Sequence, residues 1–411
     1  MRVTSLLRSI LDLKHTRVAG VRFGPDSLEV GVAPTMRVPR CSCCGRKARR
    51  VYDRRPRAWR HLDFGGMQVV LWYELRRVDC RGCGVVSEMV PWADPGARFT
   101  RDFEEHTAYL AQRTDRSTVA STMRVAWRTV GAIIERVVQR HRAGGQLDGL
   151  EHIGLDELSY RKHNQYVTTV VDHVGERVVW AAEGKNAETV GKFFDELGPE
   201  RTARLRTVTL DMSAAYVQAV ESRAPQATLV FDRFHVQRLA QDAVDELRRA
   251  EVRRLEEAGD RRSLKHTRWA LLKCPWNLST VEAERLAYLQ RTNRRLYRGY
   301  LLKTVLGDIL GRRQVGVVRK KLTEWISWAN RSRLAPFKRV AATIRRYFEG
   351  IVAIVATGLN NARTEGLNGK IRTITRRAYG LHSAGALISL IFLCCSGILL
   401  HPVFKSPPLH P

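Results

Sequence analysis

Three acidic side chains stand at places in the sequence from which they could bind divalent metal ions. Asp156 and Asp211 each end a short apolar run that is typical of a buried strand, and Glu365 lies near the start of a predicted helix. Mg²⁺ prefers oxygen ligands and keeps several waters, so a few carboxylates are enough to hold it. Two such ions about 4 Å apart can activate water and stabilise the charge that grows on a phosphoryl group. We therefore interpret Asp156, Asp211 and Glu365 as ligands of two Mg²⁺ or Mn²⁺ ions at a site that cleaves phosphodiester bonds, with Glu157 and Asp232 as nearby alternatives.

Most of the cysteines lie in one part of the chain. Five of the eight lie in one segment, where Cys41 with Cys44 and Cys80 with Cys83 form two Cys-x-x-Cys pairs and Cys43 is the fifth. Each pair is followed by a glycine, which tolerates the positive φ that turns backbone amides toward the sulfur atoms. This pattern predicts one structural Zn²⁺ bound by Cys41, Cys44, Cys80 and Cys83. The alternatives are reduced surface thiols and the use of Cys43 in place of Cys44.

The segment between the two cysteine pairs indicates a β-hairpin. Gly65 and Gly66 separate two strand-like runs at 58–64 and 67–78, and a pair of glycines is typical of a tight turn. We expect His61 to be structural rather than a zinc ligand, because four sulfur atoms already complete the shell.

The apolar pattern becomes helical between residues 99 and 142 and predicts three helices, the last at 127–141. Its inner face is expected to carry Val130, Ile133, Ile134 and Val137. The spacing fits a helix-turn-helix, with Trp127, Arg128 and Arg136 as candidate DNA contacts. Arg124 stands at the turn position that favours glycine, so a plain three-helix packing unit is the alternative.

The next part of the chain, after the flexible linker 143–149, predicts an α/β core. Strand-like runs at 151–156, 165–174 and 177–183 precede a helix at 186–197 capped by Asn186, and strands at 207–210 and 227–231 enclose a helix that begins at Ser213. The order β-β-β-α-β-α-β is that of the ribonuclease-H-like fold, in which catalytic carboxylates follow the first and fourth strands.

Residues 238–350 read as a heavily charged, all-helical insertion. Its basic clusters are typical of a solvated helix face and could also contact a phosphate backbone. Trp325 and Trp328 are spaced i, i+3, which favours core packing over stacking on an unpaired base.

The segment 360–377 predicts an amphipathic helix. Glu365, Asn368, Arg372 and Arg376 share one face and apolar residues share the other. We interpret the polar face as a metal ligand next to DNA contacts, which also include Lys370 and Arg377; a surface helix without function is the alternative.

Composition points to a polyanionic partner. Seventy Lys and Arg oppose 41 Asp and Glu, for a net charge of +29, and such an excess favours binding to phosphates over mere solubility. Residues 1–13 lack the pattern of a signal peptide, and the apolar run 386–400 is shorter than the roughly 20 residues that span a bilayer. We therefore expect a cytoplasmic protein, nucleoid-associated when bound to DNA, with a buried C-terminal helix and no membrane partner.

Several of these motifs together resemble insertion-sequence transposases of the ISL-three (ISL3) type. They are the two Cys-x-x-Cys-Gly pairs and the segments 59–63, 76–84, 154–157, 210–212, 232–235, 365–372 and 377–380. The resemblance covers nearly the whole chain and implies a DDE catalytic triad at Asp156, Asp211 and Glu365. It also implies that Asp232 and His235, with the spacing Asp-x-x-His, are auxiliary; His235 would contact a phosphate or strand, or else cap the strand end.

The sequence thus predicts a multidomain α/β plus α protein. The expected domains are an N-terminal α/β segment at 1–35, a zinc ribbon at 36–95, a helix-turn-helix-like DNA-binding region at 96–145, a ribonuclease-H-like core at 150–237 with 351–382, the helical insertion at 238–350, and an apolar helix and tail at 383–411.

The expected function is metal-dependent strand cleavage and strand transfer on double-stranded DNA. The substrates would be the terminal inverted repeats of the element and a target DNA, bound by a homodimer or larger assembly. A structure-selective ribonuclease-H-like nuclease and a zinc-ribbon DNA-binding regulator without catalysis are the two alternatives.

Overall fold

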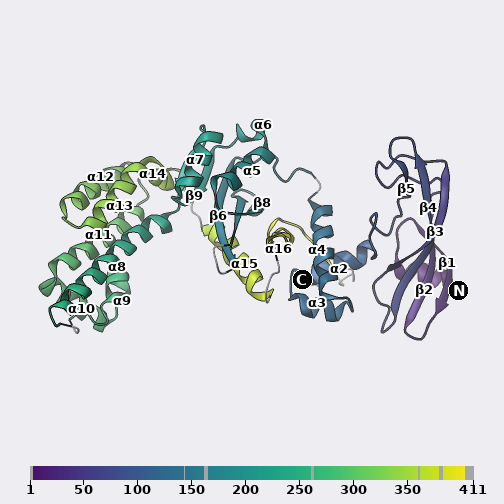
Figure 1. Ribbon diagram of the computed structural model, residues 1–411, viewed down its shortest axis with the longest axis horizontal. Coiled ribbons are helices and arrows are strands. Elements are labelled where there is room, and N and C mark those ends of the chain that lie inside the picture. The colour runs from purple at the N-terminus through teal and green to yellow at the C-terminus, as the bar shows by residue number, and fades with distance from the viewer. Residues whose placement is uncertain are drawn as a thin grey trace, which may run out of the picture. The chain divides into compact units, whose positions relative to one another are not determined.

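The computed structural model describes residues 3–142, 144–161, 165–260, 263–359, 362–378 and 383–402. The chain forms two compact units, one made mostly of residues up to Ala143 and the other mostly of Gly144–Arg376. Figure 1 shows the elements of both units along the chain. Each unit is described by itself.

The first unit contains a five-stranded sheet of order β1-β2-β4-β3, with β5 paired to the far part of β4. Its elements are α1 (Val3–Leu11), β1 (Thr16–Phe23), β2 (Ser27–Pro34), β3 (Val51–Arg60), β4 (Gln68–Cys80) and β5 (Gly84–Ser87). The hairpin expected around Gly65 is present, since β3 and β4 pair antiparallel. β2, from the predicted N-terminal segment, pairs in parallel with β4, from the predicted ribbon, and both contribute to one core around Trp59.

Three helices follow the sheet: α2 (Arg101–Ala111), α3 (Arg116–Thr122) and α4 (Trp127–His141). The predicted inner face of α4 is buried. Asp115 caps α3, with its side chain accepting from the amides of Ser117 and Thr118. The turn between α3 and α4 has the left-handed conformation that usually favours glycine, and Arg124 adopts it at φ 54°. The non-glycine residue at the predicted turn position therefore does not prevent the turn.

The second unit is built on a five-stranded sheet of order β10-β9-β6-β7-β8. Its strands are β6 (His152–Arg161), β7 (Gln165–Asp172), β8 (Arg177–Glu183), β9 (Thr207–Leu210) and β10 (Thr228–Phe231). The first three are antiparallel neighbours, and β9 and β10 run parallel to β6. The helices α5 (Ala187–Leu197), α6 (Pro199–Thr202) and α7 (Ala214–Arg223) connect these strands. Asn186 caps α5 as predicted, accepting from the Thr189 amide.

The predicted end of the first core strand at Asp156 is wrong. β6 continues to Arg161 because its other edge stays paired with β7 over that whole length. Its pairing with β9 has ended by then, since the last of those pairs is Gly154 with Thr209. Asp156 thus lies where β6 leaves its parallel neighbour.

The predicted helical insertion is present. It comprises α8 (Arg233–Glu257), α9 (Arg268–Leu272), a 3₁₀ turn (Pro275–Asn277), α10 (Thr280–Thr292), α11 (Arg294–Leu310), α12 (Val315–Arg331), α13 (Ala335–Arg346) and α14 (Phe348–Thr357). The helices α8, α11, α12 and α13 pack side by side (Figure 1). Trp325 is in the core of this bundle, where its indole N–H donates to the Leu302 carbonyl at 2.9 Å, so core packing is the correct alternative for this residue.

The insertion and the sheet share one hydrophobic core. Helix α14 packs on β10 at Gly350, where a Cβ atom would lie 2.4 Å from the Phe231 ring. Glycine is therefore required by close packing at this position.

Two helices complete the described chain, α15 (Ala362–Arg377) and α16 (Ala384–Cys395). α16 buries Leu387, Leu390, Ile391 and Phe392 as a core helix. None of the helices in the described part of the chain is long and apolar enough to cross a membrane.

Candidate active site and zinc site

Three acidic residues lie at similar levels on three adjacent parallel strands of the second sheet, one within its strand and two directly after theirs. Asp211 directly follows β9, Asp232 directly follows β10, and their preceding residues Leu210 and Phe231 are paired. Asp156 lies two residues beyond the last pair between β6 and β9. Because parallel strands end at the same edge of a sheet, this register brings the three carboxylates to one edge.

Asp156 is held by hydrogen bonds on both carboxylate oxygens. Its Oδ1 accepts from the Glu157 amide at 2.7 Å, and its Oδ2 accepts from Nδ2 of Asn368 on α15. Burial raises the pKa of the Asp156 carboxyl and the charge of Asp211 adds to the rise, whereas the two hydrogen bonds and nearby His235 lower it. Asp156 therefore lies close to Asp211, His235 and α15 together.

The neighbouring groups show the same concentration of negative charge. Burial raises the pKa of Glu157, and the charges of Asp211 and Asp156 raise it further. Burial also raises the pKa of Tyr216, as do the charges of all three acids. Several carboxylates therefore act on one another at this edge of the sheet, an arrangement that a bound cation stabilises.

Asp211 and Asp232 each receive backbone hydrogen bonds at a helix start. Oδ1 of Asp211 accepts from the Ser213 amide at 3.0 Å before α7, and Oδ1 of Asp232 accepts from the Phe234 amide at 2.9 Å as the cap of α8. The Nε2 atom of His235 lies 3.7 Å from Oδ2 of Asp232. The predicted auxiliary pair thus occupies the first turn of α8.

Asn368 has a place that the sequence did not predict. We expected a DNA contact, but its side chain is only 4% exposed and faces Asp156. Its Oδ1 atom is buried and has no hydrogen-bond partner among the residues that the structure describes. Helical spacing of three residues from Glu365 was the one signal that linked Asn368 to the triad.

Glu365 itself lies in α15, one turn before Asn368. Its side chain is outside the described residues. The buried Oδ1 atom of Asn368 and the neighbouring carboxylates are nevertheless hard oxygen donors. Such a set of donors fits Mg²⁺ or Mn²⁺.

The four predicted zinc ligands come together in the first unit. One sulfur atom from each of Cys41, Cys44, Cys80 and Cys83 lies within 4.8 Å of the others. The glycines after the two pairs have positive φ, 69° at Gly45 and 72° at Gly84. Cys43, the alternative ligand, is exposed outside this group.

His61 is buried apart from this cluster. Its Nδ1 is 2.8 Å from the Thr100 hydroxyl, and burial lowers its pKa to about 4. The imidazole is therefore a neutral core group, as expected.

Comparison with known proteins gives the family. Residues 153–391 match the family model of the DDE transposases of ISL3 elements, described as a transposase. The chain belongs to the ISL3 family of transposases. Residues 37–83 also match the zinc-finger of transposase IS204/IS1001/IS1096/IS1165, and residues 88–138 match the helix-turn-helix domain of transposase family ISL3. The predicted resemblance is confirmed, and the three domains follow in the predicted order.

Two curated relatives show how far the similarity extends. The transposase for insertion sequence element IS1557 of Mycobacterium tuberculosis is 38% identical over 431 residues, which cover 97% of this chain and 96% of the relative. The transposase for insertion sequence element IS1001 of Bordetella parapertussis is 30% identical over 357 residues, covering 86% of this chain and 88% of the relative. The zinc-finger match and the four-thiol cluster together support a structural zinc site in this ISL3 transposase.

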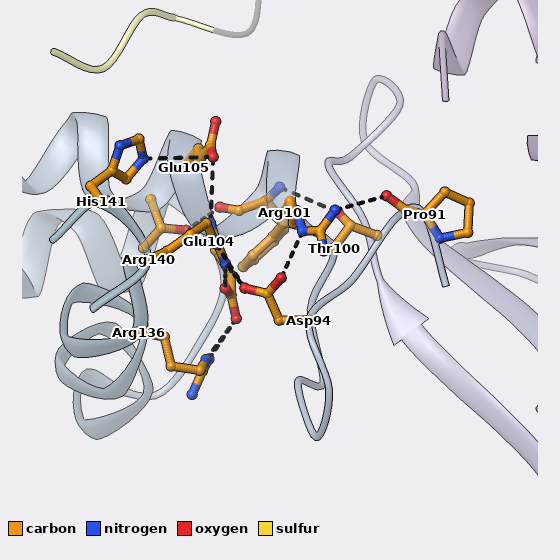
Figure 2. A network of polar contacts seen from close by, with 11 residues as sticks. Pro91, Asp94, Thr100, Arg101, Glu104, Glu105, Arg136, Arg140 and His141 are labelled. Carbon is orange, nitrogen blue, oxygen red and sulfur yellow. Dashed lines mark hydrogen bonds and ion pairs between the residues drawn. The ribbon is translucent and has the colours of Figure 1, made fainter. Parts of the chain in front are cut away.

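The candidate DNA contacts of the helix-turn-helix region divide into two groups. Arg128 is exposed on α4, and Trp127 is half-buried with the Arg116 guanidinium 4.7 Å from its ring centroid. Arg136 instead forms an ion pair at 2.7 Å with Glu104, which is completely buried. Figure 2 shows this arginine directed toward Glu104. Arg136 therefore stabilises the helical packing of this ISL3 transposase, because a buried carboxylate needs a cationic partner.

The cationic side chains of α15 also include exposed ones and one that bonds within the protein. Lys370, Arg372 and Arg376 are exposed. Arg377 donates to the carbonyls of Ala111 and Gln112, at 2.9 and 3.3 Å. Its guanidinium satisfies the end of α2, where a cation complements the helix dipole, so we assign it a structural role.

Proposed function

We propose that this chain is a DNA transposase that cuts DNA at the ends of its own insertion sequence and joins the freed ends to target DNA. The observation that carries the proposal is the single sheet edge that brings together Asp156 of β6 and the residues that follow β9 and β10, Asp211 and Asp232, with the Asn368 amide of α15 on Asp156. Membership of the ISL3 family supports the same reaction. The curated relatives are named as transposases for insertion sequence elements.

The catalytic core in this proposal is ribonuclease-H-like. The strand order β8-β7-β6-β9-β10, with an antiparallel first half and two parallel strands after it, supports that fold. The core would consist of residues 150–237 and 351–382, with the helical insertion at 238–350 between its two parts. The strands between Thr16 and Ser87 form one sheet, and we propose that the N-terminal segment 1–35 and the zinc ribbon 36–95, which share it, are followed by the DNA-binding helix-turn-helix region at 96–145.

Asp156, Asp211 and Glu365 are the proposed ligands of two Mg²⁺ or Mn²⁺ ions. When bound, such ions supply an activated water and compensation for the charge on the phosphoryl group. The chain's own groups orient the ligands. The Glu157 amide and Asn368 hold the two oxygens of Asp156, and the Ser213 amide holds Asp211.

Asp232 and His235 are the proposed auxiliary residues. Asp232 is fixed as the cap of α8, and its second oxygen is 3.7 Å from His235 Nε2. An imidazole N–H at this position can donate to a phosphate of the DNA strand.

DNA binding is shared among several regions in this proposal. The zinc ribbon and the helix-turn-helix region, with Trp127 and Arg128, would bind the terminal inverted repeats. The exposed cations Lys370, Arg372 and Arg376 of α15 would contact phosphates near the catalytic edge. Two element ends must be held together during transposition, so we propose a homodimer or larger assembly on DNA.

The test is a cleavage and joining assay with the purified full-length protein and Mg²⁺. The donor plasmid carries the native element ends, and the matched plasmid carries the same ends with scrambled sequence. We expect cuts at the native ends and joined products only with the first plasmid. Equal cleavage of both plasmids would contradict the proposal and indicate a nuclease. End binding without any cleavage would indicate a DNA-binding regulator.

A further inference from the structure

A groove runs through the helical insertion from the catalytic edge. A hollow of about 700 Å³ begins at Thr209 and Asp232, and a second one of about 480 Å³ reaches Trp276. The two hollows share Arg233, Gln237, Gly311 and Arg312 among their lining residues. We call the combined hollow the insertion groove and define it by Arg233, Phe234, Gln237, Trp276, Arg312 and Arg313.

The groove is positively charged. Arg233, Arg312 and Arg313 are exposed along it. In the described part of the chain, none of these three guanidinium groups forms an ion pair with an acid. The acidic residues in the lining are Asp232 and Asp308. Unpaired arginines in a row complement a chain of phosphate groups.

Two aromatic side chains extend from the groove into solvent. Trp276 is 69% exposed and Phe234 is 53% exposed. Large aromatic side chains at this level of exposure are typical of surfaces that bind a partner. The faces of such rings can stack on nucleic-acid bases of any sequence.

The segment that carries Trp276 is fixed, although its indole is exposed. Lys303, which is buried, donates to the carbonyls of Leu271, Leu272 and Lys273 at 2.9, 3.0 and 2.7 Å. On the other side, Ser279 and Glu282 form a capping box at the start of α10. The backbone on both sides of Trp276 is therefore fixed before any ligand binds, which lowers the entropy cost of ordering this segment.

We infer that the insertion groove binds an unpaired segment of DNA, with a base stacked on Trp276 and phosphates on Arg233, Arg312 and Arg313. The inference deepens the proposed function and rests on it, because it places a single strand next to the catalytic edge at Asp232. An unpaired strand fits better than a duplex, since base faces are available for stacking only when bases are unpaired. The groove would hold the strand beside the bond that is cut.

The test measures DNA binding without cleavage. Full-length protein is titrated, without added Mg²⁺, into two fluorescent probes: a blunt duplex of the element end, and the same duplex with a short single-stranded thymidine extension. Trp276→Ala should weaken binding of the extended probe about 5- to 100-fold, the range expected for one lost stacking contact. Binding of the blunt probe should not change.

Trp269→Ala is the matched control. Trp269 is 60% exposed in the same part of the insertion but does not line the groove, so its replacement should leave both probes unaffected. Arg312→Ala with Arg313→Ala should also weaken only the extended probe and reduce its salt dependence. Equal effects of Trp276→Ala and Trp269→Ala, or equal effects on the two probes, would overturn the inference.

The outcome is independent of the cleavage assay. A wild-type protein that cuts element ends but binds the extended and blunt probes equally would reject the groove and keep the transposase. A wild-type protein that prefers the extended probe but cuts no DNA would keep the groove and reject the transposase.

Discussion

Replacement of Arg140 by methionine should destabilise the helices of the first unit. Arg140 lies 2.5 Å from a carboxylate oxygen of Glu104 and 2.6 Å from one of Asp94 (Figure 2). Glu104 is completely buried, and removing one partner of a buried ion pair costs about 3–5 kcal/mol because a charge is left uncompensated. Arg136 still contacts Glu104 in the variant, so we expect a loss at the lower end, about 3 kcal/mol.

Hydrogen exchange of backbone amides in the full-length protein measures this loss locally. If the amides of α2 and α4 exchange through unfolding of these helices, a loss of about 3 kcal/mol accelerates their exchange roughly 100-fold. Amides of the second sheet should exchange at an unchanged rate, because they belong to the other unit.

Two further variants separate the buried charge from a general effect of losing an arginine. Arg128→Met changes an exposed residue of the same helix and should alter exchange less than threefold. The double variant Arg140→Met with Glu104→Met should recover most of the loss, because apolar replacement of both partners removes the buried charge. If the amides of α2 and α4 exchange at the same rate in Arg140→Met as in Arg128→Met, the network does not stabilise these helices and the reasoning is refuted.

Three other predictions concern His61, the thiols and Asn368. The folded pKa of His61 is about 4 against 6.5 for the free side chain, so the unfolded chain takes up a proton first as pH falls. The contribution of His61 to stability should be constant above pH 6.5 and fall by about 1.4 kcal/mol per pH unit down to pH 4, a slope that His61→Gln should remove from the pH dependence of urea unfolding. Cys80→Ser, or a zinc chelator, should weaken binding to element ends at least tenfold, whereas catalytic-site variants should not. Metal analysis measures the loss of zinc. Undiminished binding after that loss would contradict a structural zinc. Asn368→Leu should lower the cleavage rate about 10- to 100-fold by removing a hydrogen bond to a charged group, and should shift the pH–rate profile upward; an unshifted profile would show that Asn368 does not act through Asp156.

Local patterns in the sequence were sufficient for most elements. The apolar face of α4, the cap of α5 at Asn186 and the strand at 207–210 all follow from spacing within one element, and the structure has them. The four-thiol cluster follows similarly from two short motifs. These features depend on neighbours in sequence, which periodicity and turn residues report directly.

Features that depend on distant contacts could not be predicted in this way. The parallel pairing of β2 with β4 joins segments far apart in the chain, and no local signal marks it. The burial of Asn368 against Asp156 and the ion pair of Arg136 with Glu104 likewise arise only when separate helices meet. A polar residue at helical spacing looks the same whether it faces DNA or a buried carboxylate, so the sequence could not show these contacts.

The most direct test of the proposed catalytic edge is the cleavage activity of Asp156→Asn and Asp211→Asn on element-end DNA. Both variants keep the size and most hydrogen bonds of the original side chain but lose the negative charge that binds a divalent cation. Each purified full-length variant is compared with the wild type for end binding and for Mg²⁺-dependent cleavage of the same DNA. The account predicts end binding within about twofold of the wild type and no detectable cleavage by either variant. Cleavage at the wild-type rate by either variant would show that the carboxylates of this sheet edge are not the catalytic groups.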